Sequence, residues 1–381
     1  MRAMNKSIYL EKNTSTKPTH VSKRRILRAV FLLVFSVLIA GNPVTVVGQD
    51  SKLIEVPAAK VIDTPMASFA KMLPGEWKVT AASGTSMYHT WHWGPGNHSI
   101  RRFTNGKGAD GKGWREVNVY YWHPDRKQIC LLGFSPFANG LSEGTITFNG
   151  ESADAVVDLH QIGSRRKMGL HWKFEGPDLY HEKLLEAVGD EGFQTLVEFD
   201  HLRSRTAFER EPIIPDGAEL DSRFPEHLKP FEPLLGKAWQ STGKWLGKSF
   251  DIQTAIEWIP RADMIYLSVK TTGVIGESTH LLDGYLYRHT GTKALRCLAL
   301  ANDGRVYEGE ITVAADGGVQ IDLKCYGAKG MQRQIIRFDF QNDGTMQQRA
   351  WNQNEVGNDL ILELMHERRE SERQLGDDQA D

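Results

Sequence analysis

The chain has 381 residues, 25% of them charged and 40% hydrophobic, which is close to the average of soluble globular proteins. This length allows two or three domains, and the composition excludes a disordered chain, a collagen-like chain and a membrane protein with many spans. The formal net charge of -2 hides an asymmetry, because residues 1–48 hold eight basic residues and one acidic residue. The other 38 basic and 47 acidic residues give a net charge of -9, which opposes binding to nucleic acid or to an anionic membrane surface.

The first 48 residues are typical of a signal peptide or signal anchor. Lys23–Arg25 and Arg28 precede a 12-residue apolar stretch, residues 29–40, and Val46–Gly48 offers a cleavage site. A membrane-spanning helix needs about 20 apolar residues, and residues 41–43 interrupt this run. We therefore expect a secreted or periplasmic protein, or one tethered to the outer face of the inner membrane if the signal is not cleaved. The chain would contact a membrane only through this segment.

The exported part contains three cysteines, Cys130, Cys297 and Cys325. An odd number cannot all pair within one chain, so at most one disulfide bond can form. The sequence does not decide whether Cys297 and Cys325 form it. All three lie in apolar, strand-like runs, where a free buried cysteine behaves as a small hydrophobic residue. Stability is therefore expected to come from the cores.

Two halves of the chain repeat each other at an offset near 165 residues. Trp77 corresponds to Trp239 at an offset of 162, and residues 93–100, 142–147 and 196–203 correspond to residues 258–265, 307–312 and 361–368 at 165. The same offset aligns Trp122 with Tyr287. A period this long indicates a domain duplication, because solenoid and propeller repeats run over about 20–50 residues.

This correspondence sets the expected domains. They are a signal segment (1–48), a tether (49–64), a first repeat (65–204), a linker with Pro212 and Pro215 (205–223), a second repeat (224–369) and a polar tail (370–381).

Within a repeat the pattern predicts six to nine strands. Leu170, Trp172 and Phe174 alternate with polar residues, and residues 336, 338 and 340 repeat this stripe. Turns are expected at 105–106, 149–150, 302–304, 315–318 and 342–344. Residues 178–188 could form a helix, although the matching residues 346–351 look extended. Short helices are expected at 66–72 and 227–235.

About 140 residues of antiparallel strands with one apolar face per strand must stack as a sandwich or close into a barrel. Closure removes the edge strands, so we favour the barrel. The expected fold class is all-β, with two tandem antiparallel barrels and short helices after the signal segment.

A short helix, then Gly75-Glu-Trp77, and later Arg203 after the last strand resemble the pattern of lipocalins and the wider calycin superfamily, in particular the uncharacterised lipocalin-like secreted proteins of bacteria. The second repeat has one additional residue in the motif, Gly236-Lys-Ala-Trp239, and keeps Arg368. The resemblance implies that both tryptophans plug a closed barrel end and that an arginine stacks on each indole. It therefore implies a structural role for Gly75, Trp77, Arg203, Gly236, Trp239 and Arg368.

Histidines are the first candidates for chemistry. In the run from His89 to His98, strand alternation places His89 on the side of Trp91 and Trp93 and His92 on the other, so no shared metal-ligand face exists. His201 and His366 are interpreted as the one histidine position common to both repeats, at the inward end of an apolar stripe. They could be hydrogen-bonded core residues, ligand contacts, or axial haem ligands as in haem-binding barrels of the nitrobindin type.

Aromatic side chains are the second candidates. They could line a cavity for an apolar ligand or simply fill the barrels. Together with the two histidines, the candidate ligand-binding residues are Trp91, Trp93, Trp122, Trp172, His201, Trp258, Tyr287, Phe338 and His366.

The sequence contains no nucleophile elbow, His-Glu-x-x-His motif, phosphate-binding loop or Cys-x-x-Cys pair. Glu143 and Glu308 precede the shared Gly144 and Gly309 and could act as general acid and base, or simply begin a strand. The main hypothesis is an exported, non-catalytic protein that binds a small apolar or amphipathic molecule in one or both barrels, without a metal, and without a cofactor unless it is haem. The alternatives are a hydrolase or isomerase that uses the barrel cavity, and a structural or interaction module with filled barrels.

Overall fold

The computed structural model describes residues 64–73, 75–81, 86–107, 113–135, 140–189, 192–204, 224–235, 238–245, 248–259, 263–272, 279–341, 343–354 and 356–369. The expected signal segment, nearly all of the tether, the linker, the tail and Gly236 lie outside these ranges. Among the described residues, no helix is long and apolar enough to cross a membrane.

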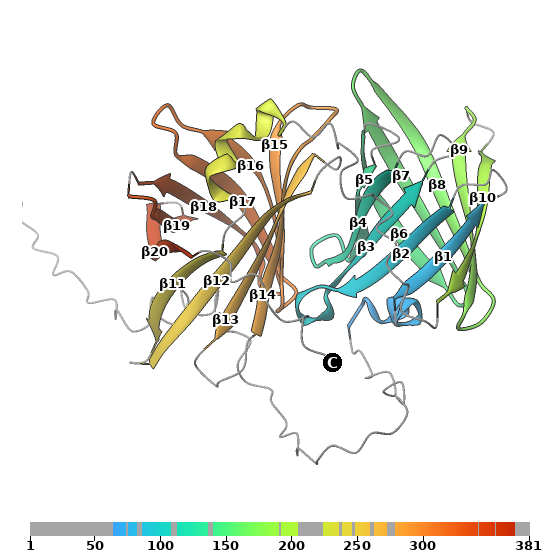
Figure 1. The fold of residues 1–381 in the computed structure, drawn as a ribbon, viewed down its shortest axis with the longest axis horizontal. Helices are drawn as coiled ribbons and strands as arrows, with labels where there is room; N and C mark the ends of the chain where they lie inside the picture. Colours follow the sequence, from blue (N-terminus) through green and yellow to red (C-terminus); the bar gives the residue numbers. More distant parts are fainter. Residues whose placement is uncertain are drawn as a thin grey trace, which may run out of the picture. The chain divides into compact units, whose positions relative to one another are not determined.

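The first ten strands close into an antiparallel barrel in which each strand pairs with its neighbours in sequence and β1 pairs with β10 (Figure 1). They are β1 (Glu76–Ala81), β2 (Ser86–Trp93), β3 (Ser99–Lys107), β4 (Gly113–His123), β5 (Gln128–Ser135), β6 (Gly140–Asn149), β7 (Ser152–Gln161), β8 (Ser164–Phe174), β9 (Leu179–Ala187) and β10 (Phe193–Arg203).

The next ten strands form a second closed barrel with the same order, sealed by the pairing of β11 with β20 (Figure 1). They are β11 (Ala238–Trp245), β12 (Lys248–Ile259), β13 (Met264–Thr272), β14 (Thr279–Arg288), β15 (Leu295–Ala301), β16 (Val306–Val313), β17 (Val319–Gly327), β18 (Gly330–Phe340), β19 (Met346–Asn354) and β20 (Gly357–Arg369). Three short 3-10 helices are described: η1 (Ala67–Met72), η2 (Pro95–Asn97) and η3 (Glu226–Leu234).

The predicted fold class, two tandem antiparallel β-barrels, is confirmed, but each barrel has ten strands rather than six to nine. Two local predictions were wrong. Residues 105–106 continue β3 instead of forming a turn, and the possible helix at 178–188 is strand β9. Because β9 hydrogen-bonds to β8 and β10 along its length, these pairings outweigh the helical propensity of its leucine and glutamate residues.

One end of the first barrel is packed by η1 and by aromatic side chains. The Phe69 ring centroid lies 5.1 Å from that of Tyr120 and 6.1 Å from that of Trp91. The indole of Trp77 donates to the carbonyl of Met72 at 3.0 Å, and the Arg203 guanidinium lies 4.2 Å from the centre of its ring. Gly75 is required here, because a Cβ atom would collide with the backbone of Trp91.

The second barrel repeats this arrangement around η3. Trp239 donates its indole hydrogen to the carbonyl of Leu234 at 3.0 Å, and the Arg368 guanidinium lies 5.9 Å from its ring centre. In both barrels the tryptophan thus donates to a carbonyl of the preceding 3-10 helix and has an arginine near its ring.

Candidate functional site

The four tryptophans proposed for the first barrel all belong to its interior, at the end packed by η1. Trp91 and Trp172 are buried, and Trp93 and Trp122 are part-buried against the same core. The ring centroids of Trp91 and Trp172 are 5.9 Å apart, so the rings contact one another closely. At this end the tryptophans fill the barrel.

Next to this aromatic cluster lies a layer of buried and part-buried charged side chains, which we call the charged layer: Arg102, Glu116 and Glu182. Arg102 Nη1 lies 3.0 Å from Glu182 Oε2, and Nη2 lies 3.4 Å from Glu116 Oε1. Arg102 is only 5% exposed, and Asn118 donates to the same Glu116 oxygen. Strands β4 and β9 therefore each provide a glutamate that contacts the arginine of β3 inside the barrel.

Two histidines border the charged layer. The ring of His201 stacks on Tyr180, with centroids 4.0 Å apart, and on its other side on His89 at 4.9 Å. His201 Nε2 lies 3.3 Å from Glu182 Oε2, and His89 Nδ1 lies 2.6 Å from the Thr104 hydroxyl. As the alternation predicted, His89 faces inward with Trp91, and His92 is exposed.

Burial shifts the pKa values of these groups in opposite directions. It lowers the pKa of both His89 and His201 well below the usual value, and the nearby charge of Arg102 adds to the effect. Burial also raises the pKa of Glu182, although Arg102 acts against that shift. At neutral pH both imidazoles are therefore uncharged.

Several polar atoms of this region have no hydrogen-bond partner among the described residues. They are His89 Nε2, Trp91 Nε1, Tyr120 Oη and His201 Nδ1, whereas Trp172 and His201 Nε2 contact Glu182, and Tyr180 contacts Arg102. Buried donors left unpaired cost roughly 1–3 kcal/mol each, so native proteins usually satisfy them with water or a ligand. The Trp91 indole nitrogen can only donate, which favours a ligand with acceptor atoms.

Beyond the charged layer the inward-facing side chains are apolar and only part-buried. The β8–β9 register pairs Trp172 with Glu182 and, one layer further, Leu170 with Leu184, and β10 adds Val197 and Phe199. Leu170, Leu184, Val197 and Phe199 all keep intermediate exposure although they face the interior. The barrel is therefore more open on this side of the charged layer than at the aromatic end.

The second barrel provides an internal comparison, because strand register identifies equivalent positions. Arg102 is the register partner of Trp91, and Leu267 is the register partner of the equivalent Ile256, so Leu267 takes the place of Arg102. In the same way Glu182 pairs with Phe199 and Gln348 pairs with the equivalent Leu364, so Gln348 takes the place of Glu182. Glu116 corresponds in the same way to Leu282. All three charges of the layer are thus replaced by neutral residues in the second barrel.

Of the residues proposed for the second barrel, Trp258, Phe338 and His366 face its interior, but Tyr287 does not. Tyr287 packs on the outer face against Phe134 of the first barrel, with ring centroids 5.2 Å apart. Tyr287 pairs with Arg296, which corresponds to Cys130 of the first barrel, and Cys130 pairs with Tyr121. The counterpart of Tyr287 is therefore Tyr121 and not Trp122. The offset is 166 in this hairpin, and a one-residue slip moves a side chain to the other face of a strand.

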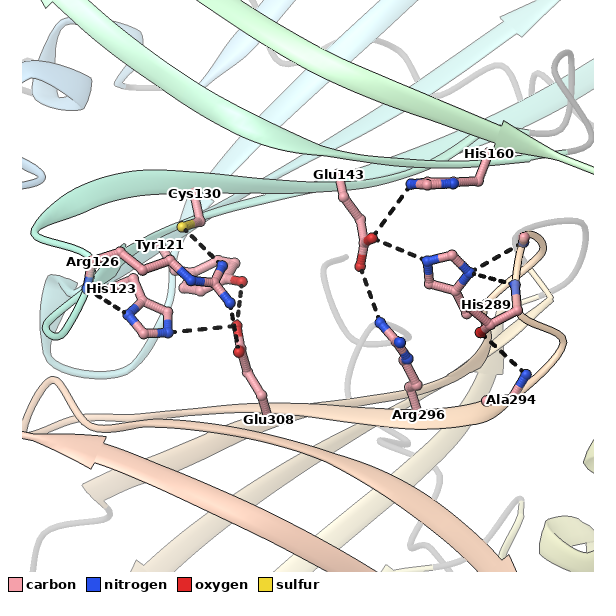
Figure 2. A network of polar contacts seen from close by, with 12 residues as sticks. Tyr121, His123, Arg126, Cys130, Glu143, His160, His289, Ala294, Arg296 and Glu308 are labelled. Carbon is pink, nitrogen blue, oxygen red and sulfur yellow. Dashed lines mark hydrogen bonds and ion pairs between the residues drawn. The ribbon is translucent and has the colours of Figure 1, made fainter. Parts of the chain in front are cut away.

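Outward-facing side chains also gather polar contacts between the barrels (Figure 2). His289 Nε2 lies 3.0 Å from Glu143 Oε2, which is also 3.6 Å from His160 Nε2, and Arg296 lies 3.8 Å from the other carboxylate oxygen. Glu308 contacts His123 at 3.7 Å and Arg126 at 2.9 Å. Glu143 and Glu308, which the sequence suggested as an acid and base, therefore belong to contacts between the barrels.

Glu143, His160 and His289 have ligand atoms within 4.8 Å of one another, a spacing that a metal ion could use. The tautomer of His289 argues against this use. Its Nδ1 accepts the backbone N–H groups of Gly291 and Thr292, both at 3.1 Å, so the neutral ring carries its hydrogen on Nε2 and donates it to Glu143. Metal-bound histidines show the reverse pattern, in which the remote nitrogen donates.

These contacts correct the interpretation that His201 and His366 are the one shared histidine position. His123 and His289 are also equivalent: each accepts a backbone N–H on Nδ1, and four residues later each turn has a lysine with positive φ, Lys127 and Lys293. The shared pattern His-x-x-x-Lys was a signal in the sequence, hidden by the offset of 166.

The surroundings of His201 and His366 do not favour haem ligation. Both faces of the His201 ring are covered by Tyr180 and His89, and its Nε2 lies beside Glu182. His366 Nε2 lies 2.8 Å from the side-chain oxygen of Gln348. Each Nε2 atom therefore already lies beside a side-chain oxygen.

Comparisons with family models and with curated proteins find no match. Among solved structures, the chain is similar to Rv2717c from M. tuberculosis, with 15% identity over 38% of this chain and 98% of that one and a TM-score of 0.26. It is also similar to a putative outer membrane protein from Bacteroides fragilis (11% identity, 77% and 95% covered, TM-score 0.18) and to a protein of unknown function of the DUF3598 family from Nostoc punctiforme (12%, 77% and 94%, TM-score 0.15). We draw no functional argument from likenesses at this level. The fold and the site define a tandem ten-stranded β-barrel protein with a charged layer inside its first barrel.

Proposed function

We propose that the protein is an exported, non-catalytic binding protein and that its first barrel holds a small amphipathic molecule. The polar end of the ligand, carrying acceptor oxygens such as a carbonyl group, lies against the charged layer. Its apolar part extends along Leu170, Leu184 and Phe199. The observation that carries this proposal is the group of buried, unpartnered donors next to Arg102, at the floor of the more open part of the barrel.

The second barrel supports this assignment by contrast. A barrel of this fold closes with Leu267, Leu282 and Gln348 in place of the three charged residues, so the charges are not needed for closure. A buried ion pair is weak evidence for stability, because desolvation offsets most of its attraction. Binding gives the charged layer a role that folding does not.

A thermal-shift screen tests the proposal. We expect amphipathic carbonyl compounds to raise the melting temperature of the wild-type protein. Arg102→Leu and Glu182→Gln, which introduce the residues of the second barrel, should lose most of that rise. Gln348→Glu in the second barrel is the matched control and should keep it. Equal shifts in all four proteins would show that the charged layer does not hold the ligand.

A second candidate function is acid–base catalysis in the same place. It is favoured by the contact between Glu182 and His201, whose pKa values are moved in opposite directions by burial. If this function holds, a ligand that stabilises the protein will be converted on incubation with the wild type and will be recovered intact after incubation with Glu182→Gln. A ligand recovered intact from the wild-type protein contradicts this second function and leaves the binding function standing.

A further inference from the structure

The second barrel has its own unpartnered polar groups, and they differ in kind from those of the first. The His366 ring is 1% exposed and Ser241 is 3% exposed. His366 Nδ1 and Ser241 Oγ have no hydrogen-bond partner in the part of the chain that the structure describes. The register of β11 with β20 runs to Gln240 opposite Glu367, and Ser241 and His366 are the next residues on these two strands.

The chemistry of His366 is defined by its other nitrogen. Nε2 lies 2.8 Å from Gln348 Oε1, an oxygen that can only accept, so Nε2 carries the hydrogen and Nδ1 is a bare acceptor. Burial lowers the pKa of His366 to about 4, which keeps this tautomer neutral at physiological pH. A group that fits Nδ1 must therefore donate a hydrogen bond.

Among the described residues, the other buried polar side chain that faces this interior is uncharged. Gln334, 2% exposed, donates to the Asn352 side chain at 3.0 Å, so this pair satisfies itself. Around these groups, Leu267, Val269, Ile336, Phe338 and Leu362 face inward and keep intermediate exposure. The interior thus combines a part-buried apolar wall with one neutral acceptor and one hydroxyl.

We infer that the second barrel is a separate binding site for an uncharged amphipathic molecule whose polar end is a hydroxyl group. The hydroxyl donates to His366 Nδ1 and accepts from Ser241, and the apolar part of the ligand contacts Leu267, Phe338 and Leu362. The two barrels therefore differ in ligand chemistry. The second site favours an uncharged ligand, because its described buried polar side chains, Ser241, Gln334 and His366, are neutral and cannot compensate the desolvation of a charge.

Isothermal titration calorimetry of the full chain tests this inference with two isomeric probes, 1-octanol and 1-methoxyheptane. They have the same atoms, but only the alcohol can donate. We expect the alcohol to bind at least fivefold more tightly than the ether. His366→Leu should abolish this preference, whereas the matched His201→Leu in the first barrel should preserve it.

Ser241→Ala is a milder second variant, which removes a donor that both probes can use. It should weaken both probes by a similar factor, about threefold, and leave their ratio unchanged. Equal affinity of the wild type for the two probes, or a preference that survives in His366→Leu, overturns the inference. If the preference is lost in Arg102→Leu instead, the alcohol binds in the first barrel, and only the second site is refuted.

Discussion

His289 donates its Nε2 hydrogen to Glu143 across the boundary between the two barrels, at 3.0 Å, and the equivalent pair His123–Glu308 makes the reciprocal contact at 3.7 Å. Each histidine belongs to a turn whose backbone N–H groups are directed at its Nδ1. Each glutamate precedes a glycine, Gly144 or Gly309, at which a Cβ atom would collide with the neighbouring strand. The repeat has thus conserved both halves of a reciprocal contact.

His289→Asn should lower the free energy of unfolding by about 1–3 kcal/mol, because it removes the buried donor to Glu143 while keeping a side-chain acceptor for the turn. Chemical denaturation measures this difference. Combining the substitution with Glu143→Gln in a double-mutant cycle isolates the pair, and we expect a coupling of about 1 kcal/mol. His92→Asn, at an exposed position, is the control. Full additivity of the two substitutions would contradict the contact.

Acid should begin to destabilise the protein near pH 6.5, above the range in which exposed carboxylates titrate. His89, His201 and His366 have pKa values below that of a free imidazole because they are buried, and in the unfolded chain they bind protons below about pH 6.5. The stability that these neutral rings provide is present above pH 6.5 and is lost as the pH falls toward about 4. Each ring can contribute up to about 1.4 kcal/mol per pH unit in this window.

Denaturation midpoints measured between pH 4 and 7 check this dependence. His366→Gln retains a side chain that can hydrogen-bond to Gln348. It should reduce the slope of unfolding free energy against pH by the amount that corresponds to about one bound proton. A flat profile through this window would show that the histidines are accessible to protons in the folded state.

The Trp–Arg pairs should differ between the barrels. Arg203 lies 4.2 Å from the centre of the Trp77 ring and also donates to the carbonyl of Lys71 at 2.6 Å, whereas Arg368 lies 5.9 Å from the Trp239 ring. Arg203→Lys should therefore cost about 1–2 kcal/mol of stability and Arg368→Lys less than about 1 kcal/mol. Thermal unfolding of the two variants compares them. Equal losses would contradict the difference in geometry.

Lys127 and Lys293 adopt φ values of 51° and 63°, which are unfavourable for a residue with a Cβ atom. Lys293→Gly should stabilise the protein slightly, or leave it unchanged, because the relief of this conformation offsets the additional freedom that glycine has in the unfolded chain. The neighbouring substitution Thr292→Gly provides no such relief and should destabilise. Differential scanning calorimetry distinguishes the two directions.

The repeat and the strand periodicity were sufficient to predict two tandem barrels, because period-2 stripes and turn residues depend on local sequence. The number of strands was underestimated in part because residues 178–188 have the composition of a helix but pair with β8 and β10 as strand β9. The turn expected at Asn105–Gly106 was wrong for a related reason, since pairing on both sides holds these residues in β3. Tyr287 was assigned to the wrong face, because a one-residue difference between the hairpins cannot be seen without their register.

Arg102 and Glu182 were missed as site residues, although their positions carried a signal. Arg102 lies two residues after the inward-facing Ile100, and Glu182 lies two residues after Tyr180, so alternation places both charges inside the barrel. The equivalent Leu267 and Gln348 show that the fold does not require them. The contact between Arg102 and Glu182, in contrast, joins strands 80 residues apart in the sequence. The spacing of residues along the chain could not predict it.

Native mass spectrometry of the protein purified from its own host tests the central claim most directly. The account predicts a population heavier than the bare chain by the mass of one small molecule, which is lost on denaturation and is absent when Arg102→Leu is purified in parallel. A wild-type chain that carries no added mass, or an identical adduct on both proteins, would contradict a ligand held by the charged layer of the first barrel.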